Sequence, residues 1–152
     1  MTKSKKRFMT MALFIIMITL IGGISTYYAT EYKKELSKIS ITINQQVIGR
    51  EIHRTIHIDN HSKYDVIVYY RNEDTKDYTA VSYMDNEPAI IYSNNTDENN
   101  SQSFSDIIDC NDNELSLYDG IEYQFNISII DDTNVFPLHF PYIVSETADL
   151  SY

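Results

Sequence analysis

Three histidines recur at intervals of four residues, at His53, His57 and His61. On a helix this spacing would stack three imidazoles on one face, as a zinc site requires. The apolar residues around them, however, alternate with polar ones, which is typical of a strand. Four strand residues span about 13 Å, whereas zinc–nitrogen bonds are about 2 Å long. We therefore expect solvent-facing histidines and no metal site here.

A polar run that starts at Asp109 is similar to the opening of a calcium-binding loop. Its oxygens at positions 1, 3 and 5 would come from Asp109, Asn111 and Asn113. An EF-hand loop also needs glycine at position 6 and glutamate at position 12, where this chain has Glu114 and Gly120. The EF-hand pattern therefore fails, which leaves a looser calcium site between strands or a simple polar turn. We expect no other cofactor.

Four glycines and one cysteine limit the catalytic chemistry open to the chain. It has no Gly-x-Ser-x-Gly elbow for a nucleophile and too few glycines for a phosphate-cradling loop. Asp109 precedes the lone Cys110, and its negative charge raises a thiol pKa, which argues against a catalytic thiolate. A single cysteine closes no internal disulfide, so Cys110 is expected to be buried or to pair with another chain. We expect no enzyme, with an exported hydrolase as the last alternative.

Tyrosine is frequent, with 13 residues, whereas tryptophan is absent. An exposed group of tyrosines offers a large contact area at low entropic cost and is a natural binding surface. The candidate binding residues are Tyr69, Tyr78, Tyr83 and Tyr92. The alternative is that these rings fill the core and its rim.

Charge is distributed unevenly along the chain. All 22 acidic residues lie at or after Glu31, with only eight of the 12 basic ones, so the part after residue 30 carries a net charge of −14. Nucleic acid and anionic lipid would repel such a domain, and we expect no nucleic-acid partner. The abundance of Ile, Asn, Lys and Tyr suggests an AT-rich genome, such as that of a low-GC Gram-positive bacterium.

The first thirty residues have the pattern of a membrane-directing segment. The chain opens with four basic residues, Lys3, Lys5, Lys6 and Arg7. Residues 8–24 then carry no charge and would form a helix of roughly 25 Å. Extension through Tyr27 and Tyr28, which suit the membrane interface, gives a length that spans a bilayer core of about 30 Å. Because basic flanks stay in the cytoplasm, we expect everything after the helix to lie outside it.

This segment has two alternative fates. A signal-anchor would keep residues 8–28 in the membrane, whereas a signal peptide would be removed after export. Signal peptides have an apolar run of about 7–15 residues, and this run is longer. The best cleavage motif is Gly23-Ile24-Ser25, directly after the run. We favour the uncleaved anchor.

After Lys38 the spacing of apolar residues changes from helical to alternating. Residues 29–38 continue the helical pattern and predict a short helical stalk. Strands are then predicted at residues 39–47, 52–58, 66–70, 78–84, 89–92 and 121–129. Residues 93–103 contain no apolar side chain and predict an exposed loop, after which Phe104, Ile107 and Ile108 are expected to return to the core. Residues 135–144 contain two prolines and predict an edge strand or an irregular closing segment.

Seven or eight short strands with frequent turns predict an antiparallel β-sandwich. Residues 117–125 resemble the turn and penultimate strand of small immunoglobulin-like extracytoplasmic domains, and residues 59–66 resemble their early corner between strands. These two stretches are short, and the cysteine and tryptophan markers of antibody-type domains are missing. We therefore expect a mainly β, Ig-like sandwich without assigning a family.

These observations predict the following layout: a cytoplasmic basic tail at 1–7, a transmembrane helix at 8–28, a stalk at 29–38 and an extracytoplasmic β-sandwich at 39–152. The expected role is a non-enzymatic binding or assembly module at the cell envelope, which contacts another envelope or secreted protein. The alternative from a different class is a secreted cation- or ligand-binding factor released after Ser25.

Overall fold

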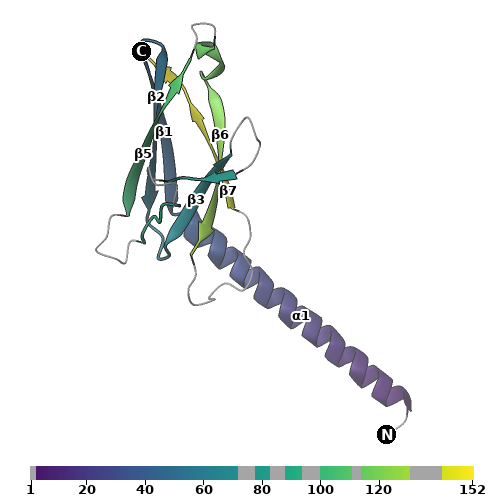
Figure 1. Cartoon of the computed structure of the whole chain (residues 1–152). Helices are drawn as coiled ribbons and strands as arrows, with labels where there is room; N and C mark the ends of the chain where they lie inside the picture. Colours follow the sequence, from purple (N-terminus) through teal and green to yellow (C-terminus); the bar gives the residue numbers. More distant parts are fainter. Residues whose placement is uncertain (1–2, 72–77, 83–87, 94–99, 111–113, 131–141) are drawn as a thin grey trace.

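The computed structural model describes residues 3–71, 78–82, 88–93, 100–110, 114–130 and 142–152. One long N-terminal helix is followed by a domain of β-strands (Figure 1). In chain order the elements are α1 (Lys3–Leu36), β1 (Ile39–Ile48), β2 (Glu51–Asn60), β3 (Val66–Arg71), β4 (Tyr78–Ala80), β5 (Ser101–Asp109), the 3₁₀ turn η1 (Leu115–Leu117), β6 (Ile121–Ile129), β7 (Tyr142–Ala148) and β8 (Leu150–Ser151). The prediction of a mainly β protein behind an apolar helix is confirmed.

The strands form two four-stranded sheets, in the orders β5-β2-β1-β8 and β4-β3-β6-β7. Pairing is antiparallel throughout both sheets, except that β1 and β8 run parallel. A single core cluster contains side chains from both sheets. The cluster consists mainly of the inward-facing residues of the strands, along which inward and outward positions alternate. These residues are mostly Ile, Val, Phe and Tyr, because such residues pack well on a pleated surface.

A tight hairpin joins β1 to β2. Ile48 pairs with Glu51, and Gly49 in the connection has a φ of 66°, a left-handed conformation that glycine adopts without steric cost. The hairpin register places Ile41 opposite Ile58, so both point into the core. The Gly-Arg pair that interrupts the alternation in sequence is therefore the turn itself.

The last turns of α1 belong to the core of the β domain. Tyr32 and Leu36 are fully buried, and Tyr28 packs against the same cluster. Burial of each of the first two side chains contributes about 2–3 kcal/mol of hydrophobic stabilisation. The helix thus enters the domain directly: Tyr32, Glu35 and Leu36 are buried in the part of the chain where the sequence predicted a short helical stalk.

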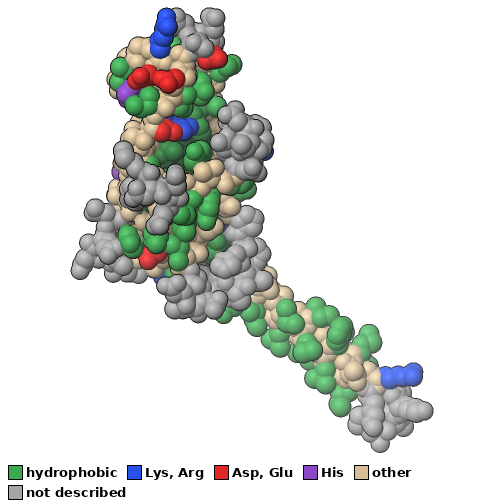
Figure 2. Space-filling model, viewed as in Figure 1, with side chains coloured by type: hydrophobic (Ala, Val, Ile, Leu, Met, Phe, Trp, Pro, Cys, Tyr) green, Lys and Arg blue, Asp and Glu red, His purple; other side chains and the backbone are tan. Residues whose placement is uncertain are grey.

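The earlier part of α1 is apolar on every side. Its large apolar side chains between Phe8 and Ile24 are all more than half exposed, and Figure 2 shows hydrophobic side chains along the exposed length of the helix. The hydroxyls of Thr19, Thr26 and Thr30 donate to the carbonyl oxygens four residues earlier, at 2.6, 2.8 and 2.8 Å. Arg7–Leu36 is long and apolar enough to span a membrane, and a signal sequence has the same character.

The predicted loop at residues 93–103 is wrong at its end, because β5 begins at Ser101. Residues 94–99 lie outside the described part of the chain. Serine is compatible with this strand because β5 is an edge strand with one wet face: the Ser103 hydroxyl lies 2.7 Å from His57 Nδ1. The expected burial of Ile107 is also wrong, since its side chain is 59% exposed. Phe104 is three residues away, and odd spacing on a strand places side chains on opposite faces.

The remaining short strands differ in extent from the prediction. Of residues 78–84, β4 takes only Tyr78–Ala80, and residues 83–84 are not described. Residues 89–92 form no named strand, although Ile91 makes an isolated bridge with Val66. Residues 135–141 are not described, and 142–144 begin β7, which lies at the edge of its sheet.

Candidate functional site

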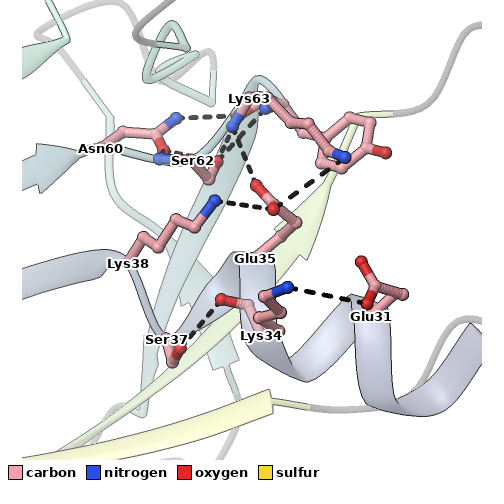
Figure 3. A network of polar contacts seen from close by, with 9 residues as sticks. Glu31, Lys34, Glu35, Ser37, Lys38, Asn60, Ser62 and Lys63 are labelled. Carbon is pink, nitrogen blue, oxygen red and sulfur yellow. Dashed lines mark hydrogen bonds and ion pairs between the residues drawn. The ribbon is translucent and has the colours of Figure 1, made fainter.

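A buried carboxylate fixes the point where α1 enters the domain (Figure 3). The Glu35 side chain is only 4% exposed, and its Oε1 lies 2.7 Å from Lys38 Nζ and 4.0 Å from Lys63 Nζ. Its Oε2 accepts a hydrogen bond from the backbone N–H of Lys63 at 3.2 Å. Two lysines near a helix C-terminus also stabilise the negative end of the helix dipole. Glu35 therefore ties the helix to the corner between β2 and β3.

The corner beyond Lys63 is held by a fully satisfied asparagine (Figure 3). Asn60 is completely buried, and its Nδ2 donates to the carbonyls of Tyr64 and Ile91 at 2.9 and 3.0 Å. Its Oδ1 accepts from the backbone N–H and the hydroxyl of Ser62 at 3.0 and 2.7 Å. Because buried amides are costly unless bonded, this complete set of partners fixes the corner in one conformation.

At the end of the domain away from α1, a buried glutamine connects separate elements of the fold. Gln45 Nε2 donates to the carbonyls of Tyr118 and Ala148 at 3.0 and 3.3 Å, and the Tyr123 hydroxyl donates to Gln45 Oε1 at 3.1 Å. The Ser151 hydroxyl donates to the Gln45 carbonyl at 2.7 Å. Gln45 thus joins the first sheet to β6 and to the C-terminal strands.

An arginine occupies an inward position of β2. Arg54 is 9% exposed, and its guanidinium carbon lies 5.7 and 5.2 Å from the ring centres of Tyr70 and Tyr123. Its Nε donates to Asp106 Oδ1 at 2.9 Å, and its Nη2 donates to Oδ2 of the same carboxylate. Burial lowers the pKa of Arg54, but the hydrogen bonds and charge of Asp106 outweigh it and hold the pKa above its ordinary value.

A hollow of about 280 Å³ lies beside this arginine. It lies between β5 of one sheet and β4 of the other, and its lining is partly apolar. The lining residues are Arg54, Ile56, Tyr70, Thr79, Ala80, Val81, Ser82, Phe104, Ser105 and Asp106. The hollow has the size of one or two large side chains and is partly open to solvent.

The tyrosines predicted to bind a partner are only partly brought together. Tyr69 of β3 and Tyr78 of β4 point to the outer face of their sheet, where Tyr78 is 39% exposed and Tyr69 is half-buried. In the same row, Asn126 pairs in register with Tyr69 and with Ile143, and its buried Oδ1 has no hydrogen-bond partner in the described structure. Tyr92 is half-buried beyond the end of β4, and Tyr83 lies outside the described residues.

Two of the three histidines lie along one strand, as the alternation of apolar and polar residues predicted. His53 and His57 are partly exposed on β2, where His53 Nε2 lies 3.1 Å from Glu51 and His57 Nε2 lies 3.3 Å from Asp59. His61 follows the end of the strand and is exposed. In the described ranges, no three His, Cys, Asp or Glu side chains are placed to hold a metal ion.

The predicted calcium loop is described only at its ends. Asp109 closes β5, whereas Asn111 and Asn113 lie outside the described residues, so the loop stays a prediction. Cys110 is a buried free thiol. Burial, with the charges of Glu114 and Asp109, raises its pKa above the ordinary value and makes it a poor nucleophile.

The sequence reasoning missed four of the residues that define these sites. Arg54 and Gln45 interrupt otherwise apolar inward positions, and this interruption was the signal that could have identified them as buried polar groups. Glu35 and Asp106 gave no such signal, because nothing local distinguishes them from solvated surface carboxylates.

The chain matches no known protein-family model and no curated protein. Among solved structures, it is similar to wild-type OgpA from Akkermansia muciniphila, with 18% identity and a TM-score of 0.24. The similarity covers 72% of this chain and 27% of that one. A TM-score this low carries no argument about fold or function.

The Glu35 contacts lead to a matched pair of substitutions. We expect Glu35→Ala to lower the free energy of unfolding by about 2 kcal/mol, because it removes a buried carboxylate and leaves the Lys63 N–H without an acceptor. Urea unfolding of the full chain in detergent micelles, followed by tyrosine fluorescence, measures this change.

Glu31→Ala is the control, because Glu31 lies one helical turn earlier, where its side chain is 31% exposed and pairs at 3.9 Å with Lys34, which is 64% exposed. Exposed pairs contribute little, so this change should cost less than about 0.5 kcal/mol. Equal effects of the two substitutions would show that Glu35 does not fix the helix to the domain.

Proposed function

We propose that the chain is a single-pass membrane protein whose basic end remains in the cytoplasm and whose β domain works outside as a binding or assembly module. The observation that carries this proposal is α1 itself. One half of the helix exposes apolar side chains on every side, and the other end is built into the β domain. A solvent-exposed apolar surface of that extent is unfavourable in water and favourable in lipid.

The hydroxyl hydrogen bonds of the helix support the same conclusion. A bilayer core offers no water to polar groups, so polar side chains within it must find partners in the protein. Thr19 and Thr26 donate to carbonyl oxygens of their own helix. Lys33 and Lys34, both exposed, follow at the side where the domain begins.

We further propose that the β domain is an immunoglobulin-like sandwich. The strand orders support this in part: the first, second and fifth strands share one sheet, and the third, sixth and seventh share the other, as in domains of that type. The short β4 joins the second group, and β8 joins the first. Tyr123 near the start of β6 also suits the tyrosine corner of such domains, with Phe125 where their second cysteine would be. Its hydroxyl, however, donates to a side chain, Gln45.

A binding role is supported by the outer face of the β4-β3-β6-β7 sheet. Tyr69, Tyr78 and Ile143 place aromatic and aliphatic surface there, around the unpartnered oxygen of Asn126. Aromatic side chains are enriched at protein–protein interfaces.

The secreted alternative has one specific observation in its favour. Cleavage after Ser25 would leave Tyr28, Tyr32 and Leu36 in place, so the domain would keep every helical residue that packs in its core. A released factor would then be as stable as the anchored one.

Membrane orientation is tested by digestion of intact cells with a protease. A tag after Tyr152 should be removed while a cytoplasmic marker protein survives, and the mature protein should begin at Met1 or Thr2 by mass spectrometry. A mature N-terminus at Thr26 would favour the secreted factor. Protection of the tag until the cells are lysed would contradict both forms of the proposal.

The outer-face binding role is tested by crosslinking in intact cells. The double variant Tyr69→Ala and Tyr78→Ala should reduce the yield of the crosslinked partner about tenfold or more, since a buried interface aromatic contributes over 1 kcal/mol. Tyr152→Ala, at the 89% exposed C-terminus, is the control and should leave the yield unchanged. An unchanged yield in the double variant would exclude this face.

A further inference from the structure

The outer edge of β5 is a row of backbone groups that no described strand covers. β5 lies at the end of the sheet order β5-β2-β1-β8 and pairs with β2 over nine residues. Figure 1 shows it along the outer side of the domain. An edge of this length is a template for an additional strand.

The register identifies the residues that face outward from this edge. At the two ends of the ladder, Asn60 N–H donates to the Asn100 carbonyl and Cys110 N–H donates to the Arg50 carbonyl. Antiparallel pairs alternate between bonded and non-bonded, so the even-numbered residues of β5 bond to β2. The odd-numbered residues therefore direct their N–H and C=O groups away from the sheet: Ser101, Ser103, Ser105, Ile107 and Asp109.

Within the described residues, this edge lacks most of the features that protect natural edge strands from pairing. Natural edge strands are blocked by charged side chains, above all lysine, by proline, by bulges, by very short length or by a charged residue that points inward. Of these features β5 has the inward Asp106, and its carboxylate is paired with Arg54. β5 reads Ser-Gln-Ser-Phe-Ser-Asp-Ile-Ile-Asp, is unbroken along its register and contains neither lysine nor proline. At the other edge of its sheet, β8 has only two residues.

The hollow beside Arg54 lies next to the same edge. Its lining includes three consecutive β5 residues, Phe104, Ser105 and Asp106. A strand paired with β5 would direct alternate side chains inward at this height, between β5 and β4. The volume of about 280 Å³ and the partly apolar lining suit an aromatic or branched aliphatic side chain.

The charges on the outer face of the sheet indicate that a strand added beside β5 would carry a basic side chain. At one end of the ladder, Glu51 and Asp109 are directly opposite each other, and like charges in that relation are unfavourable. β5 contributes no basic side chain of its own. A lysine or arginine on the outward face of a neighbouring strand would relieve this repulsion.

From these observations we infer that β5 pairs with an extended segment of another polypeptide, which completes the β5-β2-β1-β8 sheet. The segment places one apolar side chain in the hollow and a basic side chain beside Asp109. Backbone hydrogen bonds provide the affinity, and the hollow provides the selectivity. The inference rests on the proposed binding role and names the kind of partner.

A second copy of this chain fits the edge less well. β1 leaves the end of α1 directly, and β5 runs in the same direction as β1, because both are antiparallel to β2. Two β5 strands that pair antiparallel would therefore point their domains in opposite directions. Copies anchored in one membrane share one orientation, so they do not meet in that arrangement.

The test uses the full chain in lipid nanodiscs and a panel of fluorescent nine-residue peptides. Each peptide alternates Thr or Lys with Val, and the central inward residue is Phe, Val or Gly. Ser105→Pro removes an outward N–H without removing a hydrogen bond to β2, and edge strands tolerate proline. Ser105→Ala is the matched control, because both variants lose the 3.1 Å contact between Ser105 Oγ and Thr55 Oγ1 and only proline loses the N–H.

We expect the Phe peptide to bind the parent chain and the Ser105→Ala variant with the same affinity, and the Val peptide to do likewise. Each of these peptides should bind the Ser105→Pro variant at least tenfold more weakly. The Gly peptide should bind tenfold more weakly than the Phe peptide. Bound peptide should slow hydrogen exchange at Ser103, Ser105 and Ile107. Thermal unfolding should give the same midpoint for both Ser105 variants, which separates a blocked edge from a misfolded domain.

Three outcomes overturn the inference: no saturable binding of any peptide up to about 1 mM, equal binding by the proline and alanine variants, or a dimer that Ser105→Pro abolishes. Failure of the proposed function is distinguishable, because it would appear as a protected C-terminal tag in intact cells. If the domain is exported and the Ser105→Pro variant captures the cellular partner as well as the parent chain does, the proposed function stands and strand addition is excluded.

Discussion

The burial of the last two turns of α1 is the contact on which the rest of the structure depends. The part of the helix that is apolar on all sides does not by itself stabilise the β domain. The domain has a small core, and with one cysteine it has no internal disulfide to compensate. Tyr32 and Leu36 supply part of that core from the helix, and Glu35 fixes their position through Lys38 and Lys63. The helix and the domain are therefore joined by packing as well as by the chain.

Polar residues inside the domain determine how the two sheets meet. Asn60, Gln45 and Arg54 all occupy inward positions, and each contacts groups from separate parts of the chain. Because buried polar groups are costly when unpaired, these contacts favour one arrangement of the sheets over others of similar hydrophobic content. Arg54 has a second consequence, since it lines the hollow at the side where β5 and β4 leave the core open.

Much of the fold could be predicted from local patterns. The alternation in residues 39–47 and 121–129 identified β1 and β6, and the uncharged run after Arg7 identified the exposed part of α1. The β5 strand was partly missed, because an edge strand with a wet face resembles a loop in composition. The entry of α1 into the core was also missed, because Tyr28, Tyr32 and Leu36 have the spacing of any amphipathic helix. Pairing across the sheets, which creates the Arg54 hollow, depends on contacts that no local pattern contains.

The most direct test of this account compares two truncated chains, one that starts at Thr26 and one that starts at Lys38. Both lack the apolar run, and only the first keeps Tyr28, Tyr32, Glu35 and Leu36. We expect the chain from Thr26 to unfold cooperatively on heating. The chain from Lys38 should lose about 5 kcal/mol or more, comparable to the whole stability of a small domain, and show no cooperative transition. Melting temperatures within about 2 °C of each other would contradict the central role of the helix end.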